Sequence, residues 1–451
     1  MWFAKCMRRN YRRFITMYEI EEFVLCLFVV VSLYGDKSCG FDVNLLSDPV
    51  ISAANVEAAN TESNNVLNPV AKTMTNDGEL ISTPDVTPWS PLTMNYGNYP
   101  PQALPWEQSS SDSLKLVIVV HRHGERTPTR LYKNDPYSNV EKYWPEGLGQ
   151  LTTAGKSQMY KVGQLLRKRY FKHIPKFSVD TVRVFSSDAD RCLMSAGTLL
   201  AGMFPPTTDQ QWTTDINWQP IPIHTSPKAL DAINGKAKCP RFEEELSRVE
   251  KQIDANLSDS LKDLYNYLTT NSGTKVSKMK DVRRLHSTLK SEDMKGYTLP
   301  EWTDAVFPDK TRKIVQLSIA TNTWTTLLKR LRGGPLLKEI LNNLKSKSSG
   351  KAQEKLFFYS IHDTGIVSLY RTLGFKKMIL PEYGATFIFE LHQIGQEYFV
   401  KMFYLAETYS EKIKELKFPF CETLCPMEKL LKATEPVVPQ DWNQECQINK
   451  I

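Results

Sequence analysis

Three short stretches of this sequence place cationic or acid–base side chains directly after a run of apolar residues: "IVVHRHGERTPTR" (118–130), "FSSDADR" (185–191) and "YSIHDTG" (359–365). Together they supply three arginines, two histidines and one carboxylate, namely Arg122, Arg126, Arg191, His123, His362 and Asp363. Charged side chains normally spread over a solvated surface. Cations gathered beside buried segments therefore indicate a binding site for an anion.

This set of side chains suffices for the hydrolysis of a phosphate monoester. The phosphoryl group that is transferred needs positive charge around its equatorial oxygens. The planar guanidinium group of arginine can donate two hydrogen bonds to phosphate oxygens. Four side chains are expected to form this phosphate clamp: Arg122, Arg126, Arg191 and His362. His123 is the expected nucleophile, which attacks as a neutral imidazole and forms a phosphohistidine. Asp363 is the expected acid that protonates the departing alkoxide, and its carboxylate can then activate water.

The apolar pattern predicts a scaffold that brings these three distant segments together. "LKLVIVV" (114–120), "TVRVFSS" (181–187) and "KLFFYS" (355–360) are typical of strands in a parallel sheet that is buried on both faces. Helices are predicted at 152–170, 188–204 and 364–373, the second with Ser187 or Asp188 as its N-cap. The carboxyl ends of parallel strands meet at one edge of a sheet, where α/β proteins bind their ligands.

The predicted fold class is therefore α/β, with a mixed, mostly parallel sheet flanked by helices. Residues from about 240 to 345 are mostly helical in pattern and interrupt the alternation of strands and helices. We expect them to form an inserted α-helical cap beside the sheet.

The N-terminal part of the chain differs from this pattern. Residues 1–40 are predicted to be a signal peptide region, because arginines precede the apolar run "FVLCLFVVVSLY" (23–34) and small residues follow it. This run is short for a bilayer span, so secretion is favoured over an uncleaved signal-anchor. Residues 41–111 are rich in Asn, Thr, Ser, Pro and Ala without a persistent period, which predicts a disordered or low-complexity extension.

The motifs resemble those of the histidine acid phosphatases, in particular the prostatic, lysosomal and secreted animal type. The family's RHGxRxP, DxDR and HD elements stand here as "RHGERTP" (122–128), "DADR" (188–191) and "HD" (362–363). Family-like segments also occur as "NWQPIPIHT" (217–225) and "VVPQDW" (437–442). The resemblance covers residues 112–446, which we expect to be the phosphatase domain.

The resemblance implies an α/β core with a helical cap, no metal or other cofactor, an acidic pH optimum and often a homodimer. By this match His123 is the nucleophile, Asp363 the proton donor, and the four clamp residues named above bind the phosphate. Two positions depart from the family pattern. Glu125 stands where many members have Asp, and His121 replaces a usual aromatic residue. His121 is expected to pack behind the site without taking part in catalysis.

Cysteine usage favours an oxidising compartment, in keeping with a secreted or lysosomal protein. "CETLC" is typical of a short local disulfide between Cys421 and Cys425, whereas a long-range pair of Cys239 with Cys446 is implied by the family resemblance. A third disulfide common in the family has no counterpart here. Cys192 is then unpaired, and a buried, inert thiol is favoured over a reactive one. Asn256 begins the sequon "NLS" and is a candidate glycosylation site.

Other classes of function fit less well. A metallo-phosphoesterase would use His121, His123 and the His362–Asp363 pair as ligands, but the adjacent arginines would repel a divalent cation. The net charge of +7 includes no long tract of like charges, so no nucleic-acid partner is predicted. A secreted binding protein on a phosphatase scaffold remains an alternative, as do phytase or lysophosphatidate phosphatase activity, because the clamp recognises only the phosphate.

Overall fold

The computed structural model describes residues 113–422 and 424–447. The predicted signal peptide region (1–40) and the predicted extension (41–111) lie outside the described residues. None of the helices in the described part of the chain is long and apolar enough to cross a bilayer.

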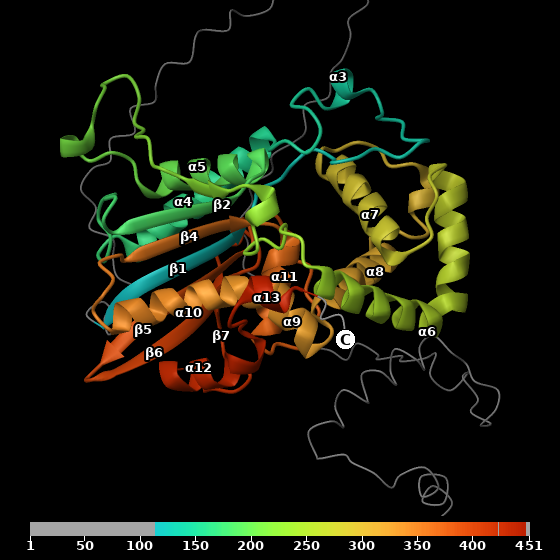
Figure 1. The fold of residues 1–451 in the computed structure, drawn as a ribbon. Coiled ribbons are helices and arrows are strands. Elements are labelled where there is room, and N and C mark those ends of the chain that lie inside the picture. Colours follow the sequence, from blue (N-terminus) through green and yellow to red (C-terminus); the bar gives the residue numbers. More distant parts are fainter. Residues whose placement is uncertain (1–112, 423, 448–451) are drawn as a thin grey trace, which may run out of the picture. The chain divides into compact units, whose positions relative to one another are not determined.

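One mixed sheet with the strand order β3-β2-β4-β1-β5-β6-β7 forms the centre of the α/β core (Figure 1). Its parallel half consists of β1 (Leu114–Arg122), β2 (Val182–Ser187), β3 (His224–Ser226) and β4 (Leu356–Ile361). Its antiparallel half consists of β5 (Thr386–Ile394), β6 (Glu397–Leu405) and β7 (Ile413–Leu416), and the short β8 (Cys425–Pro426) also pairs with β6.

The α/β class predicted from the sequence is confirmed. The three predicted strands are β1, β2 and β4, and they lie next to one another in the parallel half. Their register places Arg122 opposite Ile361, so the segments that follow β1 and β4 begin at the same edge of the sheet. The mixed character of the sheet was predicted, but the strands of its antiparallel half were not located from the sequence. This half begins with a β5–β6 hairpin whose tight turn contains Gly395 at a φ of 62°, a conformation that favours glycine.

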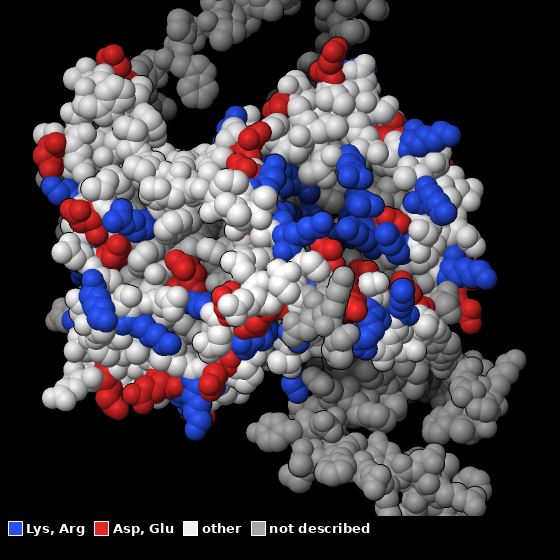
Figure 2. Space-filling model, in the orientation of Figure 1, with Lys and Arg blue, Asp and Glu red and all other residues white. Residues whose placement is uncertain are grey.

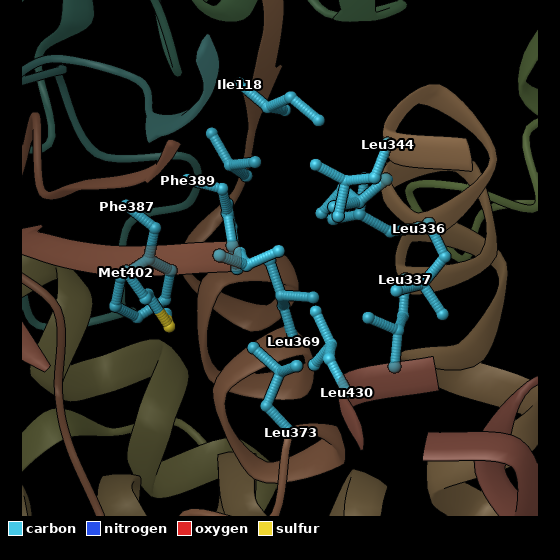
Figure 3. Close-up of a cluster of buried hydrophobic side chains, with 14 of the residues drawn as sticks. Ile118, Leu336, Leu337, Leu344, Leu369, Leu373, Phe387, Phe389, Met402 and Leu430 are labelled. Atoms are coloured by element: carbon cyan, nitrogen blue, oxygen red, sulfur yellow. The ribbon is translucent and has the colours of Figure 1, made fainter. Parts of the chain in front are cut away.

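Helices cover both faces of this sheet because successive strand residues point to opposite sides. On one face, α4 (Thr153–Tyr170) and α5 (Asp190–Met203) pack against Val117 and Val119 of β1. On the other face, Ile118 and Phe389 meet side chains from α10 (Gly334–Ser348), α11 (Asp363–Thr372) and α12 (Met427–Thr434), as Figure 3 shows.

Two details of the helices differ from the sequence-based expectation. Helix α10 falls largely within the range expected for the cap, yet its leucines, among them Leu336, Leu337 and Leu344, pack on the sheet (Figure 3). It therefore belongs to the core, since an amphipathic pattern does not say which surface a helix covers. Helix α5 is preceded by Ala189 as its N-cap, without a side-chain cap bond, instead of Ser187 or Asp188.

Four further helices lie beside the sheet core and form what we call the cap: α6 (Pro240–Ser272), α7 (Met279–Met294), α8 (Asp309–Ala320) and the short α9 (Thr326–Arg332). Two apolar clusters hold it together, one around Phe242 and Leu331 and the other around Val282 and Leu289. The short helices are α3 (Val140–Tyr143) and α13 (Trp442–Glu445). Disulfides join Cys239 to Cys446 and Cys421 to Cys425, so the structure contains both pairs expected from the sequence.

Candidate active site

The segment after β1 is held tightly against its neighbours. The backbone N–H of His123 donates to the carbonyl of Ile361 at the end of β4 (3.1 Å), and the N–H of Gly384 donates to the carbonyl of His123 (3.1 Å). The next residue, Gly124, donates its N–H to Ser195 Oγ of α5 (3.0 Å). A Cβ atom at position 124 would lie 2.6 Å from the carbonyl oxygen of Gly155, so only glycine allows the loop to lie this close to α4.

The His123 ring is fixed in one tautomer inside the site. Its Nδ1 lies 2.9 Å from the Gly124 carbonyl, which can only accept, so Nδ1 carries the proton and Nε2 keeps a free lone pair. Burial, reinforced by the charges of Arg122, His362, Arg126 and Arg191, holds the pKa of His123 well below its usual value. The imidazole is therefore neutral even in mildly acidic solution, as a nucleophile must be.

Three arginines surround this histidine. Arg122 donates from Nη1 to the Pro381 carbonyl (2.6 Å), and Arg126 donates from Nη2 to Ser287 Oγ on α7 (2.9 Å). The Nε–H groups of Arg122, Arg126 and Arg191 are all buried and have no hydrogen-bond partner among the described residues. Unpaired buried donors are costly, and three of them around one point indicate a place for an anion.

His362 and Asp363 lie at the start of α11. The His362 ring centroid is 5.6 Å from that of His123, and both its nitrogens are engaged, Nδ1 with Arg191 Nη2 (3.3 Å) and Nε2 with Ser187 Oγ (3.1 Å). Because arginine can only donate, Nδ1 accepts and His362 orients the Arg191 guanidinium. Burial, Lys236 and Arg191 together lower the pKa of His362 to about 3.

The Asp363 carboxylate approaches Arg122 on the open side of the site. Its Oδ2 is 3.6 Å from Arg122 Nη2, and its Oδ1 accepts from the Thr364 N–H (2.7 Å). Burial by itself would raise the pKa of Asp363, but Arg122, Arg283 and His362 outweigh it and hold the pKa below the usual range. All six residues singled out in the sequence thus converge on one site at the carboxyl ends of β1 and β4.

Comparison with known proteins agrees with this arrangement. Residues 113–405 match the histidine phosphatase superfamily (branch 2). This chain belongs to that family. Prostatic acid phosphatase of Bos taurus is 36% identical over 344 residues, which cover 74% of this chain and 88% of that protein. Lysosomal acid phosphatase of Rattus norvegicus is 34% identical over 346 residues, which cover 74% of this chain and 81% of that protein.

Solved structures share the fold at much lower sequence identity. The phytase from Citrobacter braakii matches with a TM-score of 0.57 and 15% identity, covering 75% of this chain and all of that chain (100%). Hafnia alvei phytase in complex with tartrate matches with a TM-score of 0.56 and 17% identity, and the match covers 74% of this chain and 98% of that chain. At these identities the likeness shows the histidine phosphatase fold alone.

The other residues discussed from the sequence lie outside the ring of arginines. His121 is fully buried in β1, and burial lowers its pKa to about 4. The Glu125 carboxylate accepts from Thr152 Oγ1 (3.0 Å). Cys192 is buried and unpaired, and burial raises its pKa to about 12. Its thiol lies 3.8 Å from His362 Nδ1, closer to the site than its helical position suggested.

Several side chains of this histidine phosphatase site were missed because they come from the cap and from the loop before β5. The buried Tyr383 ring lies 4.1 Å from the Arg122 guanidinium carbon and 5.8 Å from the His123 ring centroid. Burial should raise its pKa, yet Arg126 and Arg122 hold it below the usual value, which shows how strongly the site favours negative charge. Lys290 of α7 forms an ion pair with Glu382 beside this ring. No local sequence pattern marks these positions.

Proposed function

We propose that this protein is an acid phosphatase, which hydrolyses phosphate monoesters through a phosphohistidine at His123. One observation carries the proposal: a neutral, buried imidazole with a free Nε2 lies among three arginines whose buried Nε donors are unpaired within the described chain. Prostatic and lysosomal acid phosphatases, which are 36% and 34% identical to this chain over the aligned residues, support the same activity.

In the first step, Nε2 of His123 attacks phosphorus in line and the ester P–O bond breaks. The three arginines stabilise the charge on the equatorial oxygens, and His362 keeps Arg191 in place. Asp363 gives its proton to the leaving oxygen, so the product departs as an alcohol.

In the second step, water attacks the phosphohistidine. The Asp363 carboxylate, now ionised beside Arg122, accepts a proton from this water as the N–P bond breaks. Inorganic phosphate leaves and the neutral His123 is restored.

The electrostatics of the site favour phosphatase activity at acidic pH. Asp363 is ionised in the free protein, so its proton has to come from the substrate. A phosphate monoester carries that proton only below its second pKa, which is about 6. Once the arginines are neutralised by the bound dianion, the proton can pass to Asp363. His123 stays neutral throughout this range because its own pKa is depressed.

The decisive experiment traps the covalent intermediate. We expect rapid quenching with a radiolabelled ester to give an acid-labile phosphate on the peptide that contains His123. His123→Ala should lose both the label and turnover, whereas His173→Ala, a control on a distant histidine, should retain them. Label on another residue, or turnover by the His123 variant, would contradict the proposal. Absence of any turnover in the folded protein would favour a binding function.

The proposed setting is the secretory pathway, as the prostatic and lysosomal relatives and the two disulfides suggest. Secretion through a cleaved signal peptide, lysosomal delivery and a homodimer remain proposals. Glycosylation at Asn256 is also a proposal. Asn256 is exposed, but it lies within helix α6, whereas such sites usually lie in loops.

A further inference from the structure

Helix α4 contributes a buried amide that contacts the loop after β1. Gln158 of this helix is only 4% exposed. Its Oε1 accepts from the Glu125 N–H (3.1 Å), and its Nε2 donates to the Tyr383 carbonyl (3.0 Å). Nε2 also donates to Thr408 Oγ1 (2.8 Å). A peptide N–H can only donate and a peptide carbonyl can only accept, so the first two partners determine how the amide is oriented.

The Glu125 N–H belongs to the peptide group that fixes the His123 ring. The carbonyl of the same group, which is that of Gly124, accepts from His123 Nδ1 (2.9 Å). Because a peptide group is planar, its N–H and its carbonyl turn together. Gln158 therefore acts through one rigid unit on the ring that is proposed to attack phosphorus with Nε2.

The other end of the amide holds the residue that packs on Arg122. The Tyr383 ring lies 4.1 Å from the Arg122 guanidinium carbon, and Arg122 donates to the Pro381 carbonyl (2.6 Å). The N–H of Gly384, the next residue, donates to the His123 carbonyl (3.1 Å). One side chain thus bonds both to the loop of the proposed nucleophile and to the loop that orients a clamp arginine.

This support matters because the groups that are proposed to bind phosphate repel one another. The positive charges of Arg122, Arg126 and Arg191 all act on His123. Figure 2 shows lysine and arginine side chains gathered on the face between the end of the sheet and the cap helices. Like charges at short range separate unless other contacts hold them. Gln158 is neutral, so it holds the two loops without changing the charge that phosphate requires.

We propose that Gln158 is a positioning residue, which sets the geometry between Nε2 of His123 and the guanidinium of Arg122. This inference rests on the proposed phosphatase function and adds a residue to it. Binding of inorganic phosphate depends on the charge of the arginines, whereas the transition state also requires Nε2 to be in line with the P–O bond that breaks. Gln158 therefore affects the rate of phosphoryl transfer more than the affinity for phosphate.

Gln158→Met tests this difference, because methionine has a similar length and cannot reproduce the hydrogen bonds of the amide. In single-turnover reactions with p-nitrophenyl phosphate, we expect phosphorylation of His123 to slow by about 10–100-fold, the effect of a small misplacement of reacting groups. The inhibition constant of inorganic phosphate should change by less than about threefold, since ground-state binding uses the same arginines.

Val162→Ala is the matched control. Val162 lies one turn after Gln158 on the same face of α4 and is also buried, but it packs in the apolar cluster that contains Val117 and Val119 of β1. Its truncation should lower Tm. The phosphorylation rate of the folded control protein should remain that of wild type.

Gln158→Glu provides a second test with its own pH signature. A protonated carboxyl can accept from the Glu125 N–H and donate to the Tyr383 carbonyl, whereas an ionised carboxylate can only accept. Relative to wild type at the same pH, the phosphorylation rate of this variant should therefore fall as the pH rises and the introduced carboxyl ionises. The corresponding ratio for Gln158→Met should not depend on pH.

The outcomes separate the two proposals. A wild-type phosphorylation rate in Gln158→Met, or equal losses of rate and of phosphate affinity, overturns this inference while the phosphatase function stands. If Gln158→Met does not fold, a rate ratio for Gln158→Glu that stays constant with pH overturns it. Failure of the wild-type protein to form a phosphohistidine overturns the phosphatase function itself.

Discussion

At the residue scale, Arg122 lowers the pKa of both proposed catalytic groups, with opposite effects on their charge. It adds to the effect of burial in keeping His123 uncharged, and together with Arg283 and His362 it overcomes burial in keeping Asp363 charged. The free site therefore holds the proposed nucleophile in its neutral form and the proposed acid in its ionised form. A bound phosphate offsets the arginines and is expected to raise the pKa of Asp363, so substrate binding itself prepares the acid.

Asp363→Asn separates proton donation from phosphate binding. An alkyl ester expels a strongly basic alkoxide, so loss of the acid should slow its phosphorylation step by about 10²–10⁴-fold. A p-nitrophenyl ester expels a stable phenolate and should be affected far less in that step. Single-turnover measurements are needed, because the second step requires the same carboxylate for both substrates. Equal losses in the first step would show that another group is the acid.

Arg191→Ala tests the phosphate clamp. Loss of one preorganised donor should remove about 2–4 kcal/mol of transition-state stabilisation, and inhibition by inorganic phosphate should weaken as well. Arg183→Ala is the control, because Arg183 pairs with Glu354 (3.4 Å) at the start of β2, away from the site. Wild-type kcat/KM and phosphate affinity in Arg191→Ala would assign that residue a purely structural role.

At the scale of the elements, α7 and the residues just after it connect the cap to the long loop after β1. Ser287 reaches Arg126, Tyr297 stacks on Tyr137 with ring centroids 4.4 Å apart, and Glu292 lies buried near Asp135. The carboxylate pair is unusual among these contacts. Burial and the nearby Asp135 raise the pKa of Glu292 to about 8, and burial raises the pKa of Asp135 too.

This pair should make the folded protein more stable in acid. The pKa of Glu292 is higher in the folded protein than in the unfolded chain, so Glu292 loses its proton at a lower pH in the unfolded chain. The free energy of unfolding is therefore greatest below about pH 4.5 and decreases as the pH rises toward about 8. Glu292→Gln should therefore increase Tm relative to wild type at pH 8, by an amount worth on the order of 2 kcal/mol.

The same substitution should have little effect well below pH 4.5, where Glu292 is protonated in both states. Asp293→Asn on the exposed side of α7 is the control and should change Tm equally at both pH values. A Tm difference between Glu292→Gln and wild type that does not depend on pH would contradict the assignment.

At the scale of the whole described molecule, the start of the cap is tied to the C-terminal end of the core. The Cys239–Cys446 disulfide joins residues 207 apart in sequence, and Arg330 of α9 pairs with Glu445 of α13 (2.6 Å). The second disulfide, Cys421–Cys425, closes a loop of only four residues. The two bonds should therefore differ greatly in their effect on the unfolded chain.

Replacing both members of each disulfide by serine tests this difference. In the chain-entropy model, loss of Cys239–Cys446 should cost roughly 5 kcal/mol and loss of Cys421–Cys425 roughly 2 kcal/mol. Thermal or urea unfolding of the two double variants measures both values. An equal loss of stability would mean that local packing, not loop closure, determines what these disulfides contribute.

The sequence by itself predicted the parallel strands of the core and the six proposed site residues, because each of the six lies at or shortly after the carboxyl end of a strand. A buried apolar strand has a recognisable pattern, and its carboxyl end meets those of its parallel neighbours whatever the rest of the chain does. His123, Arg191 and Asp363 could therefore be assigned to one site before any contact between them was known.

Only the tertiary structure decided what surrounds these residues. Tyr383 and Ser287 reach the site from a loop and from the cap, where no local pattern marks a residue as facing a ligand. An amphipathic pattern likewise states that a helix buries one face but not which partner it meets, so α10 was expected in the cap and lies on the sheet. Local sequence specifies local conformation, whereas the approach of distant segments depends on how the whole chain packs.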